Sequence, residues 1–187
     1  MVRYRGVLRV TVVGCLAFVP STFVSAQAPA GGDATTQTRV HANMLQVMRG
    51  VLYPISNVVF TAQTEDPAAF EPAARVSTSP NPFTSAYGGW TAVELSGLAL
   101  AESANLLTIP GRLCGNGRPA PVQNADWQLW VQELRDAGIA AYEAAQTESQ
   151  EAILDAAGAV SESCLHCHQK YRQVPGGLVN RCLADAN

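Results

Sequence analysis

Near the C-terminus, Cys164, Cys167 and His168 form a Cys-x-x-Cys-His motif whose residue types and spacing could attach a haem. In such a motif the two thiols add to the vinyl groups of the porphyrin, and the adjacent imidazole becomes an axial ligand of the iron. The chain contains five cysteines and three histidines, so the motif stands out against a low background of both residue types. It predicts one covalently bound haem c.

Two other interpretations of Cys-x-x-Cys are disfavoured by its surroundings. In thioredoxin-like sites the pair opens a helix that follows a strand, so that the helix N-terminus stabilises a thiolate. Here the pair lies late in an alanine-rich helical pattern with no strand signal before it. A structural zinc ion would need a fourth ligand, and the candidates do not stand at a familiar spacing from the motif: His41, Cys114, His166 and Cys182.

The N-terminus predicts export to a compartment in which haem is joined to thiols. Residues 1–9 contain three arginines and no acidic residue, and residues 10–19 form a short apolar stretch. Val24-Ser25-Ala26 then supplies small residues for cleavage before Gln27, which makes residues 1–26 a signal peptide. The apolar stretch is shorter than the roughly 20 residues that a membrane-spanning helix requires.

Charge and length limit the partners and the number of domains. Loss of residues 1–26 removes three arginines and no acidic residue, so the formal net charge changes from −3 to −6. An acidic chain argues against nucleic acid as a partner, and no basic amphipathic stretch indicates a membrane surface. We expect a flexible lead-in over residues 27–35 and a single domain over residues 36–187.

The remaining cysteines are consistent with an oxidising compartment. Cys15 leaves with the signal peptide; a lipoprotein box at this residue is disfavoured, because too little apolar chain precedes it. Cys114 and Cys182 are then left to form a disulfide, which would contribute about 4 kcal/mol in the chain-entropy model. Two unpaired thiols are the alternative, because the sequence does not contain their geometry.

The elements that must position the motif are four stretches of helical periodicity. They begin near Val40, Trp90, Ala125 and Glu148, and each has apolar residues at three- and four-residue spacing. Pro54 interrupts the first stretch and predicts a kink there. Strand signals are nearly absent. The pattern predicts an all-α fold, an antiparallel four-helix bundle with the haem attached near the C-terminal end of the last helix.

Several sulfur and imidazole groups fall on inward faces of these predicted helices. The motif shares the apolar stripe of the last helix with Tyr171, so both thiols and the imidazole of His168 face the interior, whereas His166 lies on the surface. Met44 and Met48 are four residues apart on the inward face of the first helix. A methionine on such a stripe is usually core filler, but either thioether could also bind iron.

The run from Cys164 to Arg172 resembles the Cys-x-x-Cys-His-x-x-Tyr/Phe-Arg pattern of the class II c-type cytochromes, the cytochrome c′ group and its low-spin relatives. The resemblance covers most of the mature chain, but not the Pro-rich connection over residues 64–89 or the loop around Cys114. It implies a bacterial periplasmic protein in which Cys164 and Cys167 hold the haem and His168 is the proximal ligand. It also implies that the first helix supplies the distal side, where we expect Met48 rather than Met44 to bind the iron.

The same resemblance bears on Arg172 and on partners. Arg172 lies one helical turn beyond His168, which places it near the proximal face or a haem carboxylate; a solvated charge at the helix end is the alternative. Members of this family often form homodimers through their first two helices, so a second copy of the chain is one implied partner. The redox partner protein is not identified by the sequence.

Two functions follow from the sixth iron position. With Met48 or Met44 bound, the iron is six-coordinate and the protein is an electron carrier. With neither bound, the iron is five-coordinate and the protein binds nitric oxide or another diatomic gas. Peroxidase-like catalysis would require a distal acid–base group, and the one candidate, His41, is expected to be exposed. The sequence therefore predicts a periplasmic electron carrier and not an enzyme.

Overall fold

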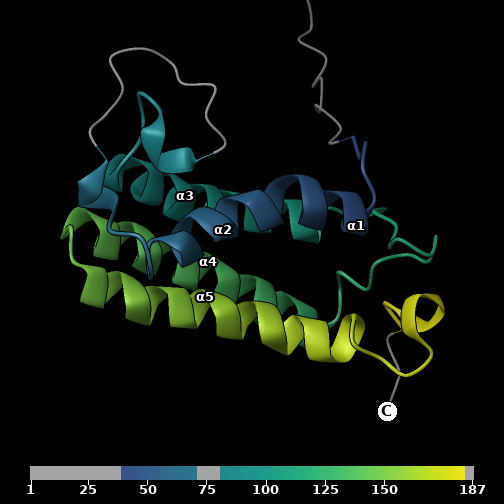
Figure 1. Ribbon diagram of the computed structural model, residues 1–187. Coiled ribbons are helices and arrows are strands. Elements are labelled where there is room, and N and C mark those ends of the chain that lie inside the picture. Colours follow the sequence, from purple (N-terminus) through teal and green to yellow (C-terminus); the bar gives the residue numbers. More distant parts are fainter. Residues whose placement is uncertain (1–38, 71–80, 184–187) are drawn as a thin grey trace, which may run out of the picture. The chain divides into compact units, whose positions relative to one another are not determined.

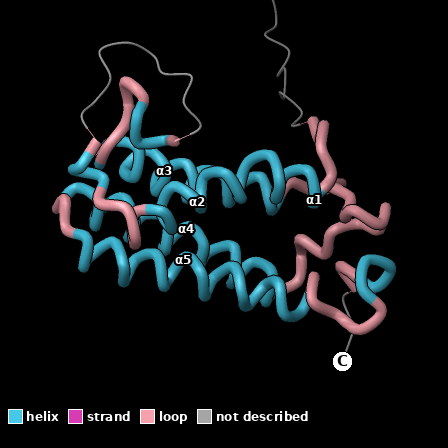
Figure 2. The backbone as a smooth tube through the Cα atoms, viewed as in Figure 1, coloured by secondary structure: helices cyan, strands magenta, loops and turns pink. Residues whose placement is uncertain are grey.

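The computed structural model describes residues 39–70 and 81–183, and regular structure in these ranges is helical (Figures 1 and 2). Within them there is no β-strand, and a single isolated bridge joins Leu113 to Pro119. The predicted all-α class is confirmed. The predicted signal peptide and lead-in lie outside the described residues. No helix in the described ranges combines the length and apolar character needed to cross a bilayer.

Each of the four periodic stretches contains a helix, with boundaries that differ slightly from the predicted ones. The α-helices are α1 (Met44–Val47), α2 (Tyr53–Thr61), α3 (Trp90–Ser103), α4 (Ala125–Gln146) and α5 (Gln150–Tyr171). The first stretch is continuous, because a π-helical turn, Met48–Leu52, joins α1 to α2. Shorter 3₁₀ segments are Pro67–Ala69, Pro82–Thr84, Ala104–Thr108 and Gly177–Asn180.

Local hydrogen bonds explain how the first helical stretch begins and why it widens. Asn43 and Gln46 form a capping box, in which each side-chain oxygen accepts from the backbone N–H of the other at 2.9 Å. Pro54 has no N–H to donate to the preceding turn. Immediately before it, the Met48 carbonyl accepts from Tyr53, five residues on, which is the π-helical pattern. The kink predicted at Pro54 therefore takes the form of a π-helical turn that begins at Met48.

The helices pack against one another through the apolar faces that the periodicity predicts. Contacts join α2 to α3, α3 to α4, α4 to α5 and α2 to α5 (Figure 1). The predicted core positions on α3, α4 and the first half of α5 are buried: Val93, Leu100, Trp127, Val131, Leu134, Ala141, Ile153, Ala157 and Val160. Burial of these side chains is the main force that holds the helices together.

Two glycines allow α3 and α4 to approach closely. A Cβ atom added to Gly97 would lie 2.5 Å from the backbone nitrogen of Tyr142, and one added to Gly138 would lie 2.7 Å from that of Ala101. Both distances are below ordinary van der Waals contact, and both end on backbone atoms that cannot rotate away. The absence of a side chain at these two positions therefore sets the spacing of α3 and α4.

We expect Gly97→Ala and Gly138→Ala each to lower the free energy of unfolding by about 1–3 kcal/mol, because the added methyl group overpacks the helix contact. Gly158→Ala is the matched control: it lies on an exposed face of α5 with nothing within 4 Å of its added Cβ. There the better helix propensity of alanine should raise stability by roughly 0.5–1 kcal/mol. Urea unfolding followed by circular dichroism measures all three, and equal effects would contradict the packing argument.

A buried arginine fixes the start of the first helical stretch. Arg112 is only 4% exposed, and its guanidinium donates to the carbonyl of Leu106 at 3.0 Å and to that of Ala42 at 2.5 Å. Burial lowers the pKa of this guanidinium. The backbone N–H of Met44 also donates to Leu113 at 2.7 Å. These bonds hold the residues before and at the start of α1 against the loop that carries Cys114.

Candidate functional site

A cavity of about 810 Å³ is lined by residues from both ends of the described chain. Met44 and Met48 of the first helical stretch line it together with Cys164, Cys167 and His168 of α5. Its volume lies within the roughly 300–1,000 Å³ that is usual for ligand and cofactor pockets. The tertiary structure therefore brings every predicted haem-site residue to the same cavity.

The lining combines an apolar interior with positive charge. Aromatic and aliphatic side chains dominate it, among them Leu52, Phe60, Leu100, Leu107, Trp127, Trp130, Val131 and Leu134. Its charged members are Arg49, Arg172 and Arg181, and none of the described lining residues is an aspartate or glutamate. A flat apolar ring with two carboxylates, which is the chemistry of haem, fits this donor set and these walls.

The motif thiols are half-buried and unbonded. Burial raises the pKa of Cys164, and burial together with the neighbouring charges of Cys164 and Asp126 raises the pKa of Cys167 to about 12. A thioredoxin-like pair needs a lowered thiol pKa, so this environment disfavours that interpretation. Within the described ranges, no group of three or more His, Cys, Asp or Glu side chains is arranged to hold a metal ion.

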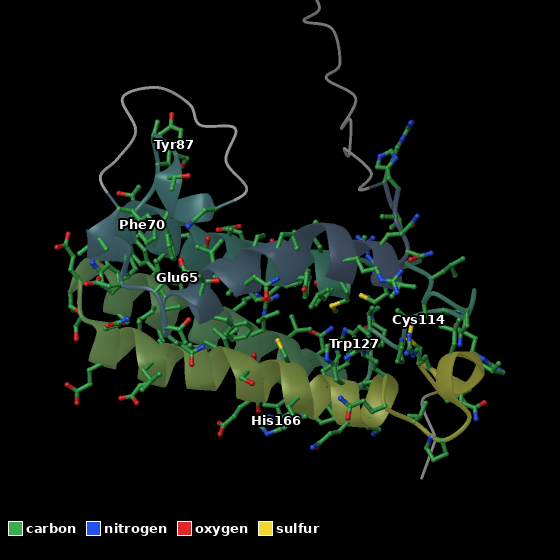
Figure 3. All side chains as sticks on the ribbon, in the orientation of Figure 1. Glu65, Phe70, Tyr87, Cys114, Trp127 and His166 are labelled. Carbon is green, nitrogen blue, oxygen red and sulfur yellow. A yellow bond between two sulfur atoms is a disulfide. The ribbon has the colours of Figure 1, made fainter. Side chains whose placement is uncertain are left out.

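His168 is half-buried at the cavity and is suited to bind iron as a neutral imidazole. Burial lowers its pKa, and the positive charges of Arg172 and Arg181 lower it further. His166, two residues away, lies on the outer face of α5, where its Nδ1 is 2.8 Å from Oε2 of Glu133 (Figure 3). As predicted, the two histidines on either side of Cys167 have different environments, because they lie on different faces of one helix.

The end of α5 is anchored to the start of α4 through Tyr171. Its hydroxyl donates to Oδ1 of Asp126 at 2.7 Å and accepts from the side-chain amide of Asn124 at 3.1 Å. Its ring makes edge contacts with Trp127 and Trp130, with centroids 5.0 and 5.9 Å apart. Burial and the bond to Asp126 raise the pKa of Tyr171 to about 12. Tyr171 thus fixes the last turn of α5, which carries His168.

Asp126 also pairs with Lys170, so two consecutive residues of α5 are held by one carboxylate. Burial alone would raise the pKa of Asp126, but the hydrogen bonds from Lys170 and Tyr171 keep it below its ordinary value.

The sequence indicates Asn124 or Asp126 as the cap of α4. Asn124 is the N-cap residue, yet its side chain makes no capping bond, and Asp126 instead accepts from Trp127 at 2.8 Å. Both side chains form hydrogen bonds with the hydroxyl of Tyr171 on α5.

The two candidate distal ligands differ in burial. Met44 is 6% exposed and belongs to the core, whereas Met48 is half-buried and is the first residue of the π-helical turn. Both line the cavity. A π-helical turn is frequently found at functional sites, and here it begins at the methionine that the sequence favours. His41 is exposed and does not line the cavity.

The C-terminal segment, residues 172–183, follows α5 (Figure 1) and contributes to the lining of the cavity, and the predicted disulfide joins it to the loop that carries Cys114. Cys114 and Cys182 are bonded, with their Cα atoms 6.5 Å apart and a sequence separation of 68. Figure 3 shows Cys114 and Trp127 near this end of α5. The predicted disulfide is confirmed, and its two cysteines themselves line the cavity.

Sequence reasoning did not find Arg49, Arg181, Trp130 or Asp126 as parts of this site. Trp130 could have been found, because it lies three residues after Trp127 on the same helix. Arg181 precedes a cysteine of the predicted disulfide, but only the folded segment shows which way it faces.

Comparisons with protein-family models, with curated proteins and with solved structures give no match to this chain.

Proposed function

We propose that this chain is an exported periplasmic c-type cytochrome that carries electrons on one covalently bound haem, similar to the class II c-type cytochromes. The observation that carries this proposal is the single cavity that brings together Cys164, Cys167 and His168 with Met44 and Met48. The thiols would hold the haem, and His168 would be the proximal ligand. The pairwise contacts of α2, α3, α4 and α5 support an antiparallel four-helix bundle around it.

When bound, haem supplies a one-electron couple whose potential depends on its ligands and on its burial. The protein's own groups would set both. Neutral His168 offers a nitrogen lone pair, and Tyr171 fixes the turn that presents it. Met48 offers a thioether, which favours the reduced iron. The apolar walls exclude water, and the arginines offer positive charge to carboxylates. Neither a substrate nor an acid–base group is needed for such a role.

Binding of a diatomic gas is the second candidate, and the composition of the cavity favours it over catalysis. Among the described residues, the lining contains no histidine besides His168 and no carboxylic acid. If the methionine thioethers do not bind the iron, a largely apolar distal pocket would remain, which would admit nitric oxide or carbon monoxide. A second imidazole or a carboxyl group, the usual acid–base groups for activating peroxide, is not among these lining residues. The two candidates share the covalent haem and differ only in the sixth iron position.

Two measurements on the purified, exported protein test the proposal. Extraction of the denatured protein with acidified organic solvent should leave the haem on the chain, because thioether bonds survive this treatment. The ferric optical spectrum should be low-spin. Haem that leaves the chain would overturn the covalent attachment. A high-spin ferric spectrum with rapid carbon monoxide binding would instead assign the protein to gas binding.

A further inference from the structure

The C-terminal segment brings a positive charge to the cavity that the sequence motif does not contain. Arg181 lines the cavity together with Arg49 and Arg172, which come from the first helical stretch and from the end of α5. The described carboxylates that form ion pairs, Glu133 and Asp126, take other partners. The three arginines therefore line a largely apolar cavity and have no ion-pair partner among the described residues.

Arg181 is half-buried, and its position is determined by its neighbours. Its Nε donates to the carbonyl of Arg172 at 3.3 Å, and this is the side-chain hydrogen bond that the structure shows for it. The N–H groups on the two terminal nitrogens of the guanidinium make no hydrogen bond with the described residues, so they can donate to a ligand. Arg181 and His168 line the same cavity, so a group bound there would have access to both side chains.

Three connections hold the backbone of Arg181 at the cavity. Cys182, the next residue, forms the disulfide to Cys114, and its N–H donates to the carbonyl of Tyr171 at 3.0 Å. The side-chain amide of Asn116 donates to three carbonyls of the same segment, those of Leu178 (3.0 Å), Val179 (3.1 Å) and Arg181 (2.9 Å). The loop that carries Cys114 thus keeps the segment folded against the end of α5.

We propose that Arg181 binds a carboxylate of the haem, and that the Cys114–Cys182 disulfide is the device that holds it there. This inference rests on the proposed covalent haem, but not on the choice between Met48 and an open sixth position. A guanidinium recognises a carboxylate through paired, charge-assisted hydrogen bonds. The disulfide then has a role beyond stability, because it joins the Cys114 loop to Cys182, the residue next to the arginine that would bind the cofactor.

The reduction potential of the haem-loaded protein tests the role of Arg181. A positive charge paired with a haem carboxylate favours the reduced iron. Arg181→Gln should therefore lower the equilibrium constant for reduction of ferric to ferrous haem about tenfold, which is a fall in reduction potential of about 59 mV for one electron. Arg181→Lys keeps the charge and should restore most of the difference. Arg118→Gln is the matched control, because Arg118 is exposed, contacts Val179 of the same segment and does not line the cavity.

The same measurement tests the role of the disulfide. In a Cys114→Ser/Cys182→Ser background the segment is released, so Arg181→Gln should change the equilibrium constant less than about twofold, a non-additive result that reveals coupling. If this background does not fold, the comparison is made on the folded, haem-loaded proteins after the Cys114–Cys182 disulfide has been reduced and its thiols alkylated. An equal effect of Arg181→Gln in the released and intact proteins would overturn the role of the disulfide.

The outcomes separate this inference from the proposed function. Haem-loaded Arg181→Gln with the same potential as Arg118→Gln would overturn the role of Arg181 and leave the cytochrome proposal standing. A purified chain that carries no covalent haem would overturn both.

Discussion

Replacing both motif cysteines, Cys164→Ser/Cys167→Ser, is expected to remove all covalently bound haem from the purified protein. Serine cannot form the thioether bonds to the porphyrin, and the half-buried thiols of this pair are the free cysteines of the described chain. A haem stain on a denaturing gel and the absorbance of the purified protein measure the loss. Each single variant should retain one thioether bond and therefore some haem signal.

The chain contains its own matched control for this experiment. Cys114→Ser/Cys182→Ser also removes two sulfur atoms that line the cavity, but it removes a disulfide instead of the motif. It should keep covalent haem and lose about 4 kcal/mol of unfolding free energy in the chain-entropy model, because a long loop is no longer closed. Haem loss in this control, or covalent haem in the motif variant, would contradict the assignment of the attachment site.

Met48→Leu is expected to convert a low-spin haem into a high-spin one that binds carbon monoxide. Leucine keeps the volume of methionine and removes the thioether, so the fold should be preserved while the sixth iron position opens. The potential should fall as well, because the thioether favours ferrous iron. Ferric and ferrous optical spectra, with carbon monoxide titration, report all of these changes.

Met44 provides the comparison, because it lines the same cavity and is four residues away. Met44→Leu should leave the spectrum low-spin, and Met44→Ala should lower the free energy of unfolding by about 2–5 kcal/mol, since Met44 is buried in the core. If Met44→Leu and not Met48→Leu opens the sixth coordination position of the iron, Met44 is the distal ligand and Met48 is not. If the wild-type protein already binds carbon monoxide rapidly, neither thioether is a ligand and the gas-binding function is correct.

Sequence periodicity and local chemistry were enough to predict the helices and to identify the motif. The apolar stripes predicted the all-α class and the buried positions of α3, α4 and α5, because burial of one helix face depends on residues three and four apart. They also placed His168 inward and His166 outward. Boundaries were less well predicted: α3 ends at Ser103 and continues as a 3₁₀ turn, and α5 begins at Gln150, capped by Ser149.

Other local signals took a form that the sequence pattern does not specify. Asn124 is the N-cap residue of α4, but its side chain makes no capping bond, and its side-chain amide donates to the hydroxyl of Tyr171. Pro54 indicated a kink, and the structure has a π-helical turn at Met48, whose carbonyl accepts from the N–H of Tyr53, five residues on. The partner of Asn124 lies on a helix distant in sequence, so the residues around Asn124 do not reveal it.

The sequence by itself determined which residues could carry chemistry in this protein: a Cys-x-x-Cys-His motif on the inward face of a late helix, and two spare cysteines able to pair. The tertiary structure decided what surrounds that motif. It closed the Cys114–Cys182 disulfide, placed Met44 and Met48 at the same cavity as His168, and brought Arg181 to that cavity from the C-terminal segment. The physical reason is that spacing along a helix fixes which residues share its face, whereas contacts between distant segments depend on packing that no local pattern encodes.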